Sequence, residues 1–251
     1  VRAMAILEVK DLEVCYGVIQ AIKGISFEVN QGEIIALIGA NGAGKTTTLQ
    51  TITGLIPSKA GTITYEGNNI TKIPGYKLVG MGIAHVPEGR RVFAELSVLQ
   101  NLKLGAYTRN DKNEMEATLK EIYARFPRLE ERKNQMAGTL SGGERQRIAI
   151  ARAIVKDAPI IVLDEATAFS DPENEYLIQK AFEKLIQNKT VVMIAHRLST
   201  IRNADKIIVM EKGHLVEEGK HNELVAAGGR YSQMWNHYTE AVDWKISGKA
   251  V

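Results

Sequence analysis

The pattern of apolar and polar positions changes twice along the chain. Residues 5 to 38 form short β-type segments with alternating or continuous apolar positions, separated by Gly and Asn turns, and residues 61 to 73 have the same character. The stretch from 92 to 137 is instead rich in charges and helical in period, as in EMEATLKEIYARF. The pattern predicts a β-rich beginning and an inserted helical region.

After residue 143 the chain alternates between helical and strand patterns. The predicted helices are ERQRIAIARAIVKD and ENEYLIQKAFEKLIQ, and the predicted apolar strands are PIIVLDEA, TVVMIAH and KIIVMEKGHLVEEG. Strands of this kind separated by amphipathic helices are typical of a parallel sheet with both faces covered. IIALIG, at 34 to 39, has the same buried character, and residues 222–251 are expected to form a C-terminal helical tail.

Composition and charge narrow the class of protein. The 251 residues are 45% hydrophobic and 24% charged, which is typical of a globular domain. The chain has 32 Lys plus Arg and 29 Asp plus Glu, so its net charge is too small to create the positive electrostatic field that would attract nucleic acid. Cys15 is the only cysteine, which excludes a disulfide within the chain and fits a reducing compartment. No stretch has the roughly 18 consecutive apolar residues of a membrane span, so we expect a cytoplasmic chain that reaches a membrane only through a partner.

The sequence GANGAGKTT, at 39 to 47, follows an apolar strand and opens a helix, which is the setting of a phosphate-binding loop. Its glycines let successive backbone N–H groups point at phosphate oxygens. Lys45 would then reach the β- and γ-phosphates, and the Thr46 hydroxyl would bind Mg²⁺. The predicted contacts to the nucleotide are Gly39, Asn41, Gly42, Ala43, Gly44, Lys45, Thr46 and Thr47.

Three further side chains end apolar strands. Asp164 is suited to the Mg²⁺ shell, and Glu165 could orient and deprotonate the attacking water. Adjacent acids at a strand end are often a solvated turn, but a phosphate-binding loop upstream favours the catalytic interpretation. His196 is either a structural histidine or, at the ligand-binding edge of the same sheet, a contact to the γ-phosphate.

The segment GTLSGGERQR, at 138 to 147, places a serine and two glycines ahead of a helix, as an anion site does, yet no lysine, base or metal carboxylate accompanies it. GANGAGKT, LSGGE, IIVLDE and the later His196 resemble, in order and spacing, the motifs of the ATP-binding-cassette ATPases. The resemblance covers essentially the whole chain. It implies one α/β domain over 1–251, with a P-loop NTPase (RecA-like) core, a mainly parallel sheet, an N-terminal antiparallel β subdomain and an α-helical subdomain at 92–155.

The resemblance also implies a site shared between two copies. Residues 141–144 would contact the γ-phosphate of ATP held by a second copy, so that a head-to-tail homodimer encloses two ATP molecules. The residues of this signature are Ser141, Gly142, Gly143 and Glu144. Lys45, Glu165 and His196 would be the catalytic residues.

Three positions are assigned by the resemblance alone. Tyr16 matches the aromatic residue that stacks on adenine, with a half-buried strand tyrosine as the alternative. Asp171 lies at the loop that communicates between the two sites. Glu88 stands where most family members have a glutamine, and a carboxylate there could touch Mg²⁺ or its waters while adding a negative charge beside the triphosphate.

Two parts of the chain resemble different subfamilies. Residues from about 5 to 144 resemble ATPase subunits of branched-chain amino acid importers, and residues from about 145 to 251 resemble the cassettes of bacterial multidrug or lipid exporters, which predicts a chimera. The resemblance implies an Mg²⁺-dependent ATPase that powers transport through transmembrane subunits. The alternative is a module that dimerises on ATP with little turnover. A soluble cassette of DNA repair or translation is disfavoured, because the sequence has neither a long coiled-coil insertion nor a second cassette.

Overall fold

The computed structural model describes residues 5–89, 91–109, 111–164, 180, 182–194 and 201–247, with only the backbone for 241–247. They form two compact units. One consists of Val1–Ile52, Ile56–Lys72 and Val192–Val251, and the other of Thr53–Leu55 and Ile73–Val191. None of the helices in the described ranges is both long and apolar enough to cross a membrane.

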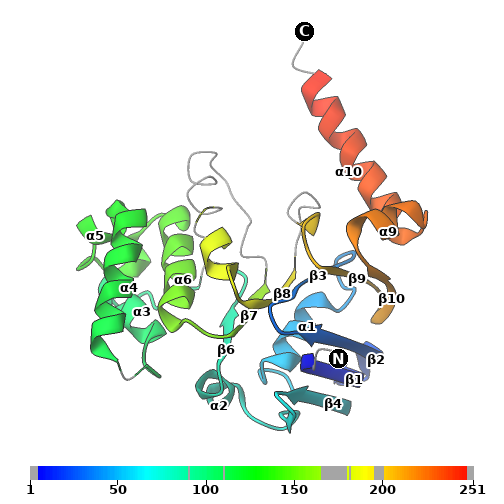
Figure 1. Ribbon diagram of the computed structural model, residues 1–251, viewed down its shortest axis with the longest axis horizontal. Coiled ribbons are helices and arrows are strands. Elements are labelled where there is room, and N and C mark those ends of the chain that lie inside the picture. Colours follow the sequence, from blue (N-terminus) through cyan, green and yellow to red (C-terminus); the bar gives the residue numbers. More distant parts are fainter. Residues whose placement is uncertain are drawn as a thin grey trace. The chain divides into compact units, whose positions relative to one another are not determined.

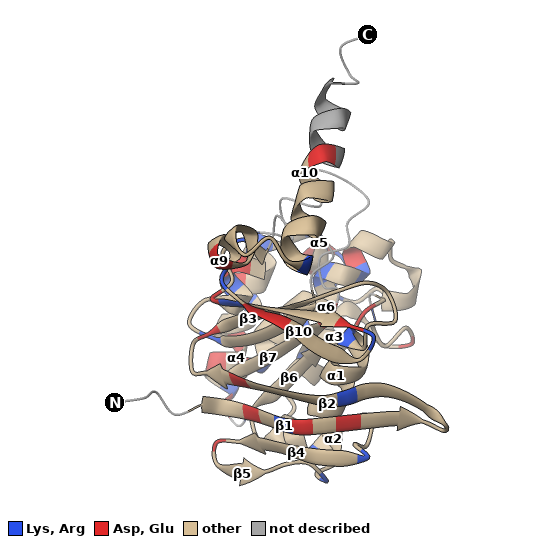
Figure 2. Cartoon of the chain, turned by 90° about the vertical axis from the view of Figure 1, so that its right-hand side faces the viewer, with Lys and Arg blue, Asp and Glu red and all other residues tan. Residues whose placement is uncertain are grey.

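The first unit contains two groups of strands. The strands are β1 Ala5–Tyr16, β2 Ile19–Asn30, β3 Ile34–Ile38, β4 Ala60–Tyr65, β5 Asn68–Asn69, β9 Lys206–Glu211 and β10 His214–Gly219. An antiparallel sheet has the order β2-β1-β4-β5, and Figure 2 shows these strands side by side. In the second group β3 pairs in parallel with β9, and β9 pairs antiparallel with β10. The segment at 206–219, predicted as one apolar stretch, is therefore a hairpin.

The two groups differ in burial as their sequences predict. Along β1 the apolar residues Leu7, Val9, Leu12 and Val14 are buried, and charged residues lie between them (Figure 2). Alternation of this kind leaves one face of a sheet to solvent. In β3 the whole run from Ile35 to Ile38 is buried, as expected for a strand covered on both faces.

Three helices of the first unit lie wholly within the described residues. They are α1 Lys45–Ile52, α9 His221–Ala226 and α10 Arg230–Ser247. α1 follows the glycine-rich loop directly. α9 and α10 are joined by a buried hydrogen bond of 2.7 Å between His221 Nδ1 and Tyr231 Oη, and the Trp235 ring packs against His221 with centroids 4.4 Å apart.

The second unit is mainly helical. Its elements are α2 Gly75–Gly80, β6 Ile83–Val86, α3 Val98–Gly105, α4 Lys112–Arg125, α5 Pro127–Glu131, a 3-10 turn at Ala137–Thr139, α6 Gly142–Lys156 and β7 Ile160–Asp164. β8, at Thr190–Ile194, runs from this unit into the first. β6 and β7 pair in parallel with Ile83 opposite Ile160, and α3, α4, α5 and α6 lie together in Figure 1. Within the helix predicted at 173–187, residues 182–186 are helical, and most of the remainder lies outside the described residues.

Contact between α3 and α6 is close because α3 ends in a glycine. A Cβ atom at Gly105 would overlap the backbone oxygen of Arg152 and would lie 3.0 Å from its Cγ atom. Any side chain at position 105 would therefore push the two helices apart. Earlier in α3, the Asn101 side chain is fully buried and bonds to Phe93 N and O, Leu96 O and Ser97 O, which fixes the loop before the helix.

Candidate functional site

The loop at 39–44 joins the buried β3 to α1 and has the geometry of a phosphate cradle. Gly39, Gly42 and Gly44 have φ angles of 149°, 78° and 103°, a region that residues with a Cβ rarely adopt. A Cβ at Gly39 would overlap the Met210 carbonyl oxygen, and one at Gly44 would overlap the Ile22 side chain and lie 3.1 Å from the Ala21 carbonyl oxygen. The predicted glycine positions therefore require glycine by conformation, and two of them by close approach as well.

Lys45 is the first residue of α1 and is only 6% exposed. Its Nζ atom donates hydrogen bonds to Gly39 O, at 2.8 Å, and to Ala40 O, at 3.0 Å. The side chain thus curls back under the loop and brings its charge beneath the backbone that precedes the helix. A cation in that place, together with the partial positive charge of a helix N-terminus, attracts a phosphate group.

Other backbone contacts hold the loop to the rest of the first unit. Ala43 donates its N–H to Ala40 O, and its carbonyl accepts the N–H of Gly213, from the turn between β9 and β10. Thr46 is half-buried, whereas Asn41 and Gly42 are exposed. The loop is therefore fixed at both ends while its tip is open to a ligand.

Tyr16 lies where β1 ends, and the structure brings it to α1. Its Oη atom and the Thr47 Oγ1 atom are 3.3 Å apart, within hydrogen-bonding distance, and the tyrosine is 48% exposed. The adjacent Val18 and Ile19 are also exposed. An exposed tyrosine with apolar neighbours offers a surface against which a flat ring could stack. Sequence reasoning found the tyrosine and missed the two aliphatic residues beside it, although their position in the turn and at the start of β2 is readable.

The second unit carries two of the predicted acidic residues. Asp164 is the last residue of β7, as predicted, and is 2% exposed, so it is buried at the end of that strand. Glu88 lies two residues after β6 and is exposed, and its backbone oxygen accepts a hydrogen bond of 3.3 Å from Arg91 Nε. Asp164 therefore ends one strand of a parallel pair, and Glu88 follows the other strand.

The signature segment caps α6 in the second unit. The Ser141 Oγ atom accepts the N–H of Glu144 at 3.3 Å and donates to Glu144 Oε2 at 2.9 Å, and the Ser141 N–H donates to the same carboxylate oxygen at 3.0 Å. This is a capping box, which satisfies N–H groups that a helix leaves without partners. Ser141 and Glu144 thus bond to each other, and Gly142 and Gly143 form the first turn between them.

Arg132, which sequence reasoning missed, supports this cap. Its Nη1 atom lies 3.3 Å from Glu144 Oε1. Burial would by itself raise the pKa of Glu144, but hydrogen bonds from Ser141 and the charges of Arg132 and Arg147 outweigh it and hold the pKa below the ordinary value. The spacing S-x-x-E predicts the capping box, but only the fold brings residue 132 to residue 144.

The predicted site residues fall into three groups. The first unit brings Lys45, Tyr16 and Thr47 to one loop and helix. The second unit brings Ser141 and Glu144 to the start of α6 and has Asp164 and Glu88 at or just after the ends of β7 and β6. The positions of the predicted water-activating acid, communicating acid and γ-phosphate histidine lie outside the described residues: these are Glu165, Asp171 and His196.

A buried strand, a glycine cradle and a buried lysine at the start of a helix define a P-loop nucleotide-binding protein. Residues 22–168 match the family model described as ABC transporter. The chain therefore belongs to the ABC transporter family, as an ATP-binding cassette of the ABC-type ATPases.

Curated relatives agree with this assignment. An ATP-dependent lipid A-core flippase of Xanthomonas oryzae pv. oryzae is 38% identical over 242 residues, which cover 93% of this chain and 41% of that protein. The mycobactin import ATP-binding/permease protein IrtA of Mycolicibacterium thermoresistibile is 38% identical over 227 residues, covering 87% of this chain and 24% of the relative. The chain thus spans at most about two fifths of the length of these relatives.

Solved structures share the fold. A bacterial Atm1-family ABC exporter with ATP bound has a TM-score of 0.80 and 32% identity over 92% of this chain and 41% of its own. An ATP-binding cassette of an ABC transporter in its ADP conformation has a TM-score of 0.73 and 28% identity over 88% of this chain and 92% of its own. The predicted α/β fold, with an antiparallel N-terminal sheet and a mainly parallel core sheet, is confirmed. The comparisons give no support to a chimera, because the flippase match spans nearly the whole chain.

Proposed function

We propose that this chain is an Mg²⁺-dependent ATPase that closes head to tail with a second copy around two ATP molecules and reopens after hydrolysis. The observation that carries the proposal is the loop at 39–44, whose glycines adopt conformations and close approaches that exclude side chains and which encloses the buried Lys45. A loop with this shape leaves room beside its backbone for phosphate oxygens.

The first unit would bind most of the nucleotide. Lys45 is already buried beneath the loop, where its Nζ atom donates to Gly39 O and Ala40 O. On binding ATP it would donate instead to oxygens of the β- and γ-phosphates. Tyr16 would stack on adenine, and its exposed position next to Val18 supports that role. Its contact with Thr47 would hold the ring near the helix that bears the phosphates.

The metal and the attacking water would be held by side chains at the ends of strands and at the start of α1. Thr46 and Asp164 supply the oxygen ligands that Mg²⁺ prefers, and Glu88 would act on the metal or on its waters. When bound, Mg²⁺ would neutralise charge on the β- and γ-phosphate oxygens. Glu165 would take a proton from the attacking water, and His196 would contact the γ-phosphate.

The signature would complete the site of the other copy. The first turn of α6 presents backbone N–H groups and the positive end of the helix dipole, with glycine at both positions after the cap. Asp171 would relay the state of one site to the other. This function does not require that the chain combine two subfamilies.

The chain would work at the cytoplasmic face of a membrane. We propose that membrane-spanning partner segments transmit its closure and reopening, as the names of the flippase and the ATP-binding/permease relatives suggest. The substrate that is moved would then be selected by those segments rather than by this chain.

A mixing experiment tests the shared site. Gly142→Glu places an acid in the first turn of α6, where it suits the helix dipole but repels phosphate. It should abolish phosphate release while ATP binding through the first unit persists, and Gly142→Gln is the matched uncharged control. A heterodimer of Gly142→Glu with Lys45→Ala has one site with both lesions and one site with neither, so activity should return on mixing.

The dependence on concentration separates the proposal from its alternative. Specific activity of the wild-type chain should fall on dilution below the range in which dimers form, because mass action governs assembly of the active species. Constant specific activity on dilution, or no recovery on mixing, would refute the shared site. ATP-dependent dimerisation in gel filtration without phosphate release would instead favour a binding module with little turnover.

A further inference from the structure

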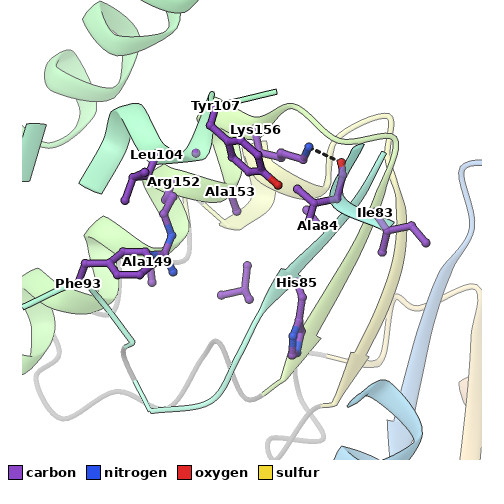
Figure 3. A pocket seen from close by; sticks show the side chains of 13 residues that line it. Ile83, Ala84, His85, Phe93, Leu104, Tyr107, Ala149, Arg152, Ala153 and Lys156 are labelled. Atoms are coloured by element: carbon purple, nitrogen blue, oxygen red, sulfur yellow. Dashed lines mark hydrogen bonds between the residues drawn. The ribbon is translucent and has the colours of Figure 1, made fainter. Parts of the chain in front are cut away.

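A cavity of about 280 Å³ lies in the second unit between β6, α3 and α6 (Figure 3). Its walls are mainly apolar. The lining residues that matter below are Phe93, Leu104 and Ala153, with Arg152 and Lys156 on α6 and His85 on β6. All of them belong to the second unit, so the cavity is complete within it and contains none of the residues assigned above to ATP.

Its floor depends on the close contact of two helices. Gly105 lets α3 approach α6 at Arg152, as its overlap with any added Cβ shows. Small residues on α6, Ala149 and Ala153, leave space on the face that looks toward β6. Three small residues, Gly105, Ala149 and Ala153, therefore line this part of the cavity.

Two cationic side chains, Arg152 and Lys156, line the cavity from positions one helical turn apart on α6. Residues four apart lie on the same face of a helix. The Lys156 Nζ atom donates to Val79 O at 2.6 Å and to Thr108 Oγ1 at 2.7 Å, which leaves one of its three protons for another acceptor. Arg152 donates from Nη2 to Arg91 O at 3.0 Å, and its guanidinium lies 5.3 Å from the Phe93 ring centroid. Burial lowers the pKa of both side chains, which means that their charges are poorly solvated.

His85, on β6, also lines the cavity, and in Figure 3 its ring lies apart from Arg152 and Lys156. Its Nε2 atom is buried and has no hydrogen-bond partner among the described residues. Burial lowers the pKa of His85 to about 4, so the ring is neutral at pH 7 and offers a hydrogen bond without a charge. A buried polar atom without a partner is costly, and a ligand that supplies one is favoured.

We propose that this cavity is a binding site for a small amphipathic carboxylate, whose anionic end meets Arg152 and whose apolar body packs between Phe93, Leu104 and the alanines of α6. Charge complementarity selects the anion, because none of the described lining residues is Asp or Glu whereas two are cationic. A guanidinium with free N–H groups binds carboxylates in a planar fork. Apolar walls with a few convergent polar groups are the usual form of a small-molecule site.

The probe for a test is 3-phenylpropionate, with 3-phenylpropan-1-ol as its uncharged match. The intact chain is labelled with ¹⁵N-histidine, and the His85 signal is identified by its loss in His85→Gln. We expect 3-phenylpropionate to shift that signal with a Kd in roughly the millimolar range, as befits a ligand of this size. The alcohol should bind at least about tenfold more weakly, because it lacks the charge that Arg152 would meet.

Three variants locate the site. Arg152→Gln should raise the Kd for the carboxylate at least about tenfold, and Leu104→Trp should abolish binding by filling the cavity without changing its charge. Lys103→Gln removes a cation from an exposed position of the same α3 helix outside the cavity and should leave the Kd unchanged. Unchanged affinity for fluorescent ATP shows that each variant is folded.

Four results would overturn the proposal. Three of them are equal binding of the acid and the alcohol, no shift of the His85 signal at saturating probe, and full binding by a folded Leu104→Trp variant. A loss of affinity in Lys103→Gln equal to that in Arg152→Gln would also overturn it, since the attraction would then come from the general charge of the helical unit.

Discussion

Replacing Gly39 with alanine should damage the chain in a way that its geometry predicts. The φ angle of Gly39 is 149°, in a region that is almost confined to glycine. An added Cβ would also lie 3.1 Å from the Met210 carbonyl carbon and 3.2 Å from the Ala43 Cβ, and it would overlap the Met210 oxygen. Met210 belongs to β9, which pairs with β3 over the residues just before Gly39, so neither strand can retreat alone.

A matched substitution separates backbone strain from the steric clash. Gly67, in the turn between β4 and β5, has a φ of 77°, and no atom lies within 4 Å of the place that an added Cβ would occupy. Gly67→Ala should therefore cost only the strain of a left-handed residue, about 1–2 kcal/mol. Gly39→Ala adds an overlap with backbone, and strain and overpacking together should lower the free energy of unfolding by about 2–6 kcal/mol.

Urea unfolding of the two variants and the wild type measures the difference. A fluorescent-ATP titration below the unfolding transition then measures the function of the loop, and we expect affinity to be lost in Gly39→Ala and kept in Gly67→Ala. Equal unfolding free energies for the two variants would show that β3 and β9 accommodate the methyl group. If Gly39→Ala also bound ATP as the wild type does, the cradle assigned to this loop would be wrong.

Three further predictions concern charged and titratable groups. Lys45→Ala should weaken ATP binding in the same titration, because it removes the cation beneath the loop, and unchanged affinity would refute that role. Glu144→Gln should lower the free energy of unfolding by about 1–2 kcal/mol at neutral pH. Because the pKa of Glu144 is depressed in the folded chain, the stabilisation by its charge is complete above pH 4.5, and the loss should shrink progressively as pH falls below 4.5 through the folded-state pKa. Burial lowers the pKa of His85 from 6.5 to about 4, so between these pH values the unfolded chain binds more protons than the folded chain. The free energy of unfolding, measured with urea, should therefore fall by up to about 3 kcal/mol from pH 6.5 to pH 4. The fall should be smaller in His85→Gln.

The fold was predictable where one physical signal dominated. The fully apolar runs of β3 and β7 predict strands covered on both faces, and the capping box before α6 marks where that helix begins. β6 was missed because it has only four residues, and one of them is His85, so neither length nor apolar pattern distinguishes it from a loop. Its pairing with β7 is a contact between distant segments, which no local pattern contains.

The site was predictable to the extent that its chemistry is local. A P-loop is a property of nine consecutive residues, so the positions of the glycines and of Lys45 follow from sequence. The contact between Tyr16 and Thr47 spans 31 positions, and the ion pair of Arg132 with Glu144 depends on how α5 and α6 pack. Such contacts depend on tertiary structure, which a single sequence does not display.

The signature at 141–144 combines side chains that stabilise the start of a helix with a glycine pair that we propose to contact phosphate. Ser141 and Glu144 exchange hydrogen bonds in the capping box, and Arg132 holds the carboxylate, so these two polar side chains stabilise the start of α6. Gly142 and Gly143 occupy the first turn, where helix geometry supplies no carbonyl partner for the backbone N–H groups. With no side chains to cover them, these N–H groups are what the helix can offer to an anion. The serine and glutamate therefore account for the helix, and the glycine pair accounts for the proposed contact with phosphate.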